Sequence, residues 1–153
     1  MSKTSETNVI AREEFLDCLK QSEQGNTDAL YLVGLSYFLG KGVRKNRRNA
    51  VKLWTKAAEN GHTDAQCWLA ECYECGLGTS KNIVLAYDWW RTAAANGSVR
   101  AMMAIVWAYL IKRNDENIRI IISKAEAMNC CKTAAEKGNY LAKKILKSSW
   151  FKA

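Results

Sequence analysis

The chain has 153 residues, of which 23 are basic and 15 acidic, giving a formal net charge of +8. Hydrophobic residues make up 48% of the sequence, which excludes an intrinsically disordered chain, and the absence of proline leaves long segments free to be helical. The longest aliphatic run, residues 118–122, is interrupted by an arginine and falls far short of the roughly 20 residues that a membrane span needs, so no transmembrane segment is expected.

A five-residue motif recurs along the chain at a nearly constant step. It reads Gly-Asn-Thr-Asp-Ala at 25–29, Gly-His-Thr-Asp-Ala at 61–65 and Gly-Ser-Val-Arg-Ala at 97–101, each copy 36 residues after the last, and Gly-Asn-Tyr-Leu-Ala follows at 138–142. A period in the range of roughly 20–50 residues indicates stacked supersecondary units. We therefore predict one domain, 1–153, with a half repeat 9–25, repeats 26–61, 62–97 and 98–138, and a half repeat 139–153.

The first full repeat predicts a helix, a tight turn and a second helix. Apolar residues recur at helical spacing between Ala29 and Leu39. The Gly-Lys-Gly segment at 40–42 ends this helix because glycine tolerates positive φ. Asn46 can cap the second helix, which Gly61 ends. Residues 13–25, before this repeat, align with the second helix of a repeat.

Residues 62–97 repeat the pattern, whereas residues 98–138 depart from it. Lys112 and Asn114 stand where the two turn glycines should be, five extra residues follow, and Cys131 takes a tryptophan position, so we expect a remodelled turn. A last helical half follows, and atypical terminal halves are what capping of a repeat stack requires. The predicted fold is all-α, with seven to eight helices forming antiparallel pairs in a short, open superhelix.

These residues resemble the Sel-one-like repeat family, relatives of the tetratricopeptide repeat. The family pattern Ala-x-Tyr-x-Leu-Gly-x-x-Tyr-x-x-Gly-x-Gly-Val is similar to Ala-Leu-Tyr-Leu-Val-Gly-Leu-Ser-Tyr-Phe-Leu-Gly-Lys-Gly-Val at 29–43, and its Lys-Ala-Ala-x-x-Gly ending is similar to residues 56–61. The resemblance covers roughly residues 13–150. It implies a right-handed α-solenoid whose first helices line a concave face, and it implies adaptors that assemble other proteins, often in bacteria, with no shared catalytic residues.

Residues of the first helices that packing does not require are predicted to face the groove. Several are large and apolar, which suits the binding of a helix or an extended peptide, and Trp68 and Trp107 would be the hot spots. The alternative interpretation is that neighbouring units bury these side chains. The predicted groove residues are Leu32, Leu35, Phe38 and Leu39, then Trp68, Glu71, Glu74 and Cys75, then Ala104, Trp107, Leu110 and Ile111.

A basic run between residues 41 and 56 holds seven cationic side chains and no acidic one. It predicts an acidic protein partner, or nucleic acid as an alternative function, while the simplest interpretation is a solvated turn. We favour the solvated turn because nucleic-acid binding calls for a broader basic stripe with interleaved aromatic residues. The basic patch consists of Lys41, Arg44, Lys45, Arg47 and Arg48.

Two further patterns concern metal binding and catalysis. Three cysteines, Cys67, Cys72 and Cys75, lie near His62, but structural zinc takes ligands from separated segments, so we expect thiols without a metal or a cofactor. Ser-Trp-Phe-Lys at 149–152 matches the Ser-x-x-Lys signature of penicillin-binding proteins, and β-lactam binding has been proposed for some members of the resembled family. A weak hydrolase of β-lactam type is therefore an alternative function, although the companion motifs are missing.

The function predicted from these patterns is a non-catalytic protein–protein interaction module, an adaptor in bacterial signalling, secretion or effector immunity. Its partner is expected to be a protein or peptide held in the groove. The first eight residues are polar and lack an apolar signal region, so the expected location is the cytoplasm, where the six cysteines would mostly be free thiols. No membrane partner is expected, and the chain is predicted to be a monomer or a weak homodimer.

Overall fold

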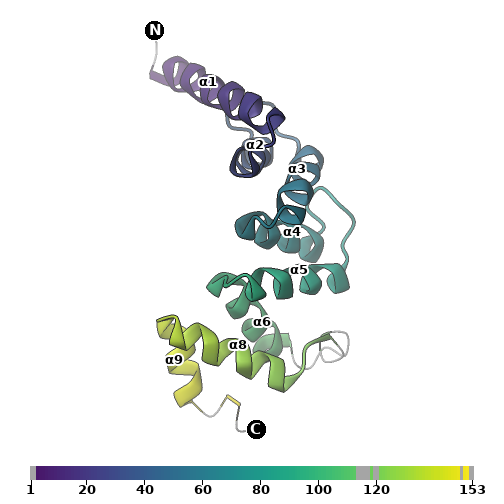
Figure 1. The fold of residues 1–153 in the computed structure, drawn as a ribbon, viewed down its shortest axis with the longest axis vertical. Helices are drawn as coiled ribbons and strands as arrows, with labels where there is room; N and C mark the ends of the chain where they lie inside the picture. Colours follow the sequence, from purple (N-terminus) through teal and green to yellow (C-terminus); the bar gives the residue numbers. More distant parts are fainter. Residues whose placement is uncertain (1–2, 113–117, 119–120, 149, 152–153) are drawn as a thin grey trace. The chain divides into compact units, whose positions relative to one another are not determined.

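The structure, a computed structural model, describes residues 3–112, 118, 121–148 and 150–151. Within these residues the only regular elements are α-helices (Figure 1), so the predicted all-α class is confirmed. The helices are α1 (Lys3–Glu23), α2 (Thr27–Leu39), α3 (Arg47–Glu59), α4 (Thr63–Cys75), α5 (Ile83–Ala95), α6 (Val99–Lys112), α8 (Lys124–Glu136) and α9 (Tyr140–Lys147).

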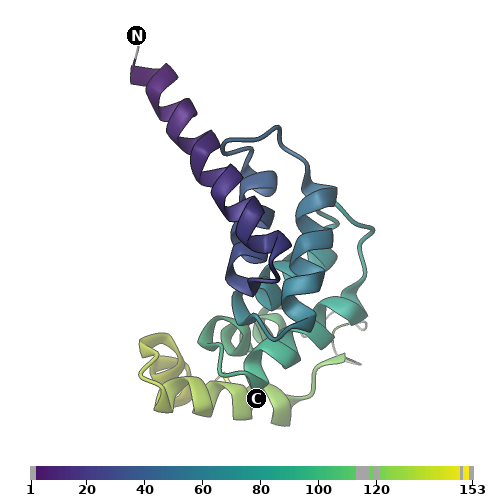
Figure 2. The same ribbon diagram turned by 45° about the horizontal axis from the view of Figure 1, so that its top comes forward.

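The chain divides into two compact units, residues 1–86 and 87–153, and the division falls within α5. In the first unit α1 packs against α2, α2 against α3, and α3 against α4. In the second unit α6 packs against α8, and α8 against α9. Helices that follow one another in the sequence are thus neighbours in space, as Figures 1 and 2 show for each unit.

The recurring five-residue motif is the junction between one repeat and the next. In each copy the residue after the glycine accepts a hydrogen bond from the backbone N–H three positions later, through the side chains of Asn26, His62, Ser98 and Asn139. That hydrogen bond caps the first helix of the repeat. The alanine that ends each copy is buried, so the motif combines a helix stop, a helix start and a core contact.

The core of the first unit is built from small residues that face a large one. Trp54 of α3 is fully buried, and its Nε1 donates to the backbone oxygen of Tyr31 at 3.1 Å. Gly34 of α2 lies against the indole, since a Cβ atom there would be 2.5 Å from Trp54 Nε1. Ala57 and Ala58 are also buried. Short side chains therefore let α2 and α3 approach closely around one tryptophan.

Within the described residues, the segment from α6 to α8 differs from the first two repeats. Lys112, at the position equivalent to Gly40 and Gly76, belongs to α6. The two glycines instead follow directly after the ends of α2 and α4. Asn114, at the position of the other turn glycine, lies outside the described residues. Cys131 is fully buried at the tryptophan position.

An ion pair that was not predicted from the sequence joins α5 to α8. Arg91 of α5 donates through Nε to Glu126 Oε1 of α8 at 2.6 Å, and through Nη2 to the backbone oxygen of Ile121. The carboxylate of Glu126 raises the pKa of Arg91 above its usual value, because the hydrogen bond favours the charged guanidinium. Arg91 therefore ties both the start of α8 and the backbone before it to α5.

None of the helices described here combines the length and the apolar character that crossing a bilayer requires. The longest of them, α1, has a polar composition.

Candidate functional site

An apolar pocket of about 300 Å³ lies between α1 and α2. Its α2 wall contains three of the predicted groove residues, Leu32, Leu35 and Leu39, of which the first and last are exposed. Its α1 wall contains the buried ring of Phe15 and the half-buried Cys18. Because leucine side chains remain open to solvent around a hollow, this pocket can take an apolar side chain from another molecule.

The rim of the pocket is charged. Lys41 Nζ donates to Glu14 Oε2 at 2.8 Å, and both residues line the pocket. Both side chains are more than half exposed, so this ion pair contributes little to stability. It nevertheless joins the turn after α2 to α1 at the edge of the apolar walls.

Three aromatic rings, those of Phe38, Trp54 and Trp68, cluster where α2, α3 and α4 meet. The ring of Phe38 lies 5.3 Å from that of Trp54 and 5.3 Å from that of Trp68, measured between centroids. The two indoles stack at 5.2 Å. Trp54 belongs to the core, whereas Phe38 and Trp68 are half-buried and present part of their surface to solvent. The aromatic surface of α2 and α4 is therefore supported from behind by a rigid core residue.

We call the predicted groove residues of α2 and α4 in the first unit the α2/α4 surface. Glu71 and Glu74, also on α4, are half-buried, and Cys75 at the end of the helix is exposed. The surface combines an apolar pocket, an aromatic step and two carboxylates. Its residues are Leu32, Leu35, Phe38, Leu39, Trp68, Glu71, Glu74 and Cys75.

The sequence model of the Sel1 repeat family matches residues 27–62 and 63–98. The chain is similar, at 30% identity and a TM-score of 0.71 over 82% of its length, to a protective antigen of uropathogenic Escherichia coli that displays the same repeat fold. The chain contains two Sel1 repeats. The likeness in structure confirms the predicted tetratricopeptide-like α-solenoid class.

Two other solved structures are similar to the chain. A Sel1 repeat protein from Oxalobacter formigenes shares 28% identity over 86% of the chain, with a TM-score of 0.73. Cysteine rich protein B of Helicobacter pylori shares 27% identity over 59% of the chain, with a TM-score of 0.57. The chain spans 26% of the Escherichia coli antigen and 51% of the Oxalobacter protein. A comparison with curated proteins gives no match.

The remaining predicted groove residues lie on α6, in the second unit. Trp107 and Ala104 are half-buried, and Ile111 is 69% exposed. Leu110 is only 5% exposed, so its side chain belongs to the interior and not to an accessible groove. Leu110 was predicted to face the groove because the equivalent residues of α2 and α4 were predicted to do so. However, α6 is apolar on most of its circumference and is buried on more than one side.

The five basic-patch residues lie in different surroundings. Lys41 is paired with Glu14, and the guanidinium of Arg47 lies over the ring of Phe38, 5.3 Å from its centroid. That placement makes Arg47 part of the aromatic surface through a cation–π contact. The patch is not an aromatic-interleaved stripe of the kind that binds nucleic acid. The remaining members, Arg44, Lys45 and Arg48, are exposed.

The cysteines and the histidine were the candidate metal ligands. All six cysteines lie in the described part of the chain and are free thiols. Within that part, no three His, Cys, Asp or Glu side chains come together as a metal site would require. His62 Nδ1 accepts a hydrogen bond from the N–H of Ala65, and its ring stacks on Tyr31 at 4.5 Å. Ser149 and Lys152 of the Ser-x-x-Lys sequence lie outside the described residues.

Thiol reactivity is expected to separate buried from exposed cysteines. Burial, with a smaller contribution from Glu71, raises the pKa of the Cys72 thiol to about 12, so almost no thiolate forms at pH 8. Cys75 is exposed. With the thiol reagent DTNB at pH 8, followed by mass-spectrometric mapping, we expect rapid modification of Cys75 and modification of Cys72 only in urea. Equal rates for the two in the folded protein would contradict this assignment.

Proposed function

We propose that this Sel1 repeat chain is a non-catalytic adaptor that binds a peptide or protein partner through the α2/α4 surface. The observation that carries the proposal is the leucine-lined pocket of about 300 Å³ next to the half-buried rings of Phe38 and Trp68. An apolar side chain of the partner would occupy the pocket, and a second would pack on the aromatic step. Sel1 repeat modules typically mediate interactions between proteins, which supports this reading.

The charges of the surface favour particular partners. Glu71 and Glu74 place two carboxylates on the aromatic side, and Arg47 and the Lys41–Glu14 pair lie at its borders. A segment with apolar anchors and a nearby basic residue fits this distribution. In the second unit, Trp107 and Ile111 are further candidate contact residues. Adaptor roles in bacterial signalling, secretion or effector immunity, a cytoplasmic location and a monomer or weak homodimer belong to this proposal.

Leu39→Asp tests the pocket directly. Leu39 is 58% exposed, so an aspartate there is expected to leave the fold intact while placing a charge where the partner's apolar side chain would sit. We expect the affinity for the purified partner, first identified by affinity capture from the native host, to fall about tenfold or more in calorimetric titration.

Val84→Asp is the matched control for that substitution. Val84 of α5 is 57% exposed and does not line the pocket. The control variant is expected to bind the partner as the unaltered chain does. If Leu39→Asp and Val84→Asp bind the partner equally well, the pocket is not the binding site.

The alternative of a β-lactam hydrolase has a rapid test of its own. Sel1 repeat proteins are generally non-catalytic, and the single histidine of this chain serves as a helix cap with its Nδ1 engaged by a backbone N–H. We expect no turnover of nitrocefin by the purified protein above the rate in buffer. Turnover that Ser149→Ala abolishes would overturn the non-catalytic assignment.

A further inference from the structure

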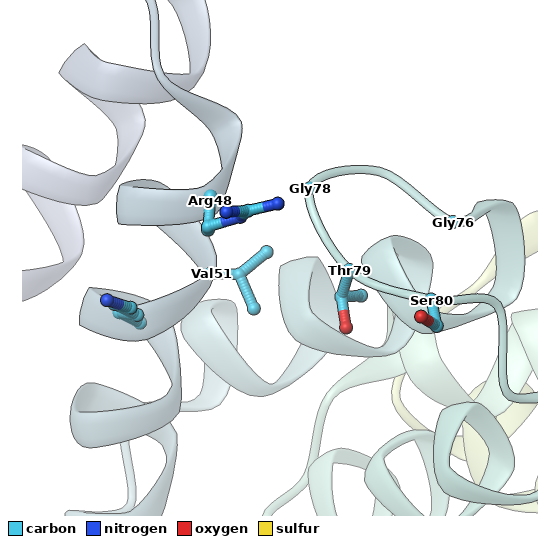
Figure 3. Close-up of a pocket in the computed structure, with 7 residues that line it drawn as sticks. Arg48, Val51, Gly76, Gly78, Thr79 and Ser80 are labelled. Carbon is cyan, nitrogen blue, oxygen red and sulfur yellow. The ribbon is translucent and has the colours of Figure 1, made fainter.

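A second hollow, of about 750 Å³, lies between α3 and the connection that follows α4. Figure 3 shows Arg48 and Val51 extending from α3 toward the connection, and it shows Thr79 and Ser80 on the connection itself. The hollow shares no residue with the α2/α4 surface, so it requires an explanation of its own. It is lined by Arg48, Val51, Lys52, Gly76, Gly78, Thr79 and Ser80.

The hollow is positively charged without compensation. Arg48 and Lys52 are one helical turn apart, both are exposed, and no residue of the lining is acidic. Within the described residues neither cation has a carboxylate oxygen within the 4.0 Å of an ion pair. Two unpaired cations at the edge of a hollow attract a ligand with two negative charges.

The connection after α4 supplies hydrogen-bond donors to the same place. Its ends are fastened, since the N–H of Leu77 donates to Cys72 O at 2.9 Å and that of Asn82 to Tyr73 O at 2.8 Å. Between them, the N–H groups of residues 78–80 and the hydroxyls of Thr79 and Ser80 donate to no acceptor in the part of the protein that the structure describes. The middle of the connection is therefore rich in available donors.

The connection also lies close against α3. Gly78 has φ +78°, and a Cβ atom there would lie 2.5 Å from the backbone oxygen of Arg47. Only glycine permits this approach. Donors that are already positioned lose little conformational entropy when a ligand binds, so the arrangement favours binding.

The hollow is not a general consequence of the repeat. The equivalent positions in the preceding repeat, 36 residues earlier, also hold two cations, Arg12 and Arg44, but the others are apolar or glycine and none carries a hydroxyl. Phe15, Leu16 and Val43 replace Val51, Lys52 and Thr79, respectively. The combination of two cations with two hydroxyls is thus particular to residues 48–80.

We propose that this hollow binds a phosphate monoester. Arg48 and Lys52 would neutralise the dianion, and the hydroxyls of Thr79 and Ser80 would donate to its oxygens, which accept hydrogen bonds from several directions. The hollow leaves room for a molecule that carries the phosphate, either a phosphorylated side chain or a nucleotide. This site is independent of the proposed adaptor surface.

Titration of ¹⁵N-labelled full-length protein with O-phosphoserine, AMP and sodium acetate, at an ionic strength held constant with sodium chloride, tests the proposal. We expect saturable shifts of the amide signals of Gly78, Thr79 and Ser80 with the two phosphates and none with acetate. Tighter binding of O-phosphoserine indicates a phosphorylated side chain as the carrier, and tighter binding of AMP indicates a nucleotide. Absence of saturable shifts at residues 78–80, or equal shifts with acetate, would overturn the proposal.

Two variants separate the site from diffuse attraction. Lys52→Gln and Thr79→Val are each expected to weaken phosphate binding, the former about tenfold or more, since a charged hydrogen-bond partner is lost. Lys56→Gln removes the same charge one turn farther along α3, outside the hollow, and is expected to change affinity by less than about twofold. An equal loss in Lys52→Gln and Lys56→Gln would show that general charge, not this hollow, attracts the anion.

Discussion

Replacing Trp54 by alanine is expected to lower the free energy of unfolding by about 3–5 kcal/mol, the range for removal of a large aromatic core residue. The side chain is fully buried, touches the rings of Phe38 and Trp68, and donates its Nε1–H to Tyr31 O at 3.1 Å. Its loss leaves a cavity between α2 and α3 and removes the hydrogen bond to Tyr31 O. Urea unfolding followed by far-ultraviolet circular dichroism measures the change.

Two further variants serve as comparisons for the stability loss of Trp54→Ala. Trp54→Phe keeps a ring in the core and removes the donor, so it is expected to cost less than Trp54→Ala. Trp150→Ala removes a tryptophan that is 48% exposed, and it is expected to change stability by less than about 0.5 kcal/mol. A loss below about 1 kcal/mol for Trp54→Ala would contradict the packing described for the first unit.

Replacing Trp68 by alanine is expected to affect binding more than folding. Its indole is half-buried and stacks on Trp54, so the solvent-facing part of its ring is supported by the core. Large aromatic residues at the centre of an interface contribute about 2–4 kcal/mol, which corresponds to a loss of roughly 30-fold or more in partner affinity. Calorimetric titration of the partner identified by affinity capture measures this loss, and the helical circular dichroism signal should persist.

The same control variant serves this prediction. Trp150 follows α9 in the sequence and is not a residue of the α2/α4 surface. Trp150→Ala is therefore expected to leave partner affinity unchanged. Two results would contradict the role given to Trp68. One is unchanged affinity of Trp68→Ala, and the other is a loss of stability as large as that of Trp54→Ala, which would make Trp68 a core residue.

The sequence predicted the framework of the molecule well because that framework depends on local interactions. The capping side chain of each junction, such as Asn26 or His62, bonds to a backbone group only three residues away. The burial of Trp54 and of Cys131 at equivalent places in two repeats also follows from the period. Such features require only helical geometry and a repeating core contact.

The candidate site was predicted only in part. Register placed Leu32, Leu35 and Leu39 on one side of α2, but the α1 wall that turns them into a pocket, with Phe15 and Cys18, was not anticipated. Leu110 was assigned to the groove by register and is buried. Register gives the direction of a side chain on its own helix, whereas exposure depends on what neighbouring helices cover.

By itself, the order of amino acids determined the all-α class and the helix caps at the repeat junctions, since glycines, capping side chains and small core residues act over a few positions. The tertiary structure alone decided which apolar residues stay open to another molecule and which polar ones meet. Arg91 reaches Glu126 across 35 positions, and Lys52 shares a hollow with Thr79. Contacts of that range depend on how helices pack, and packing is set by many side chains at once.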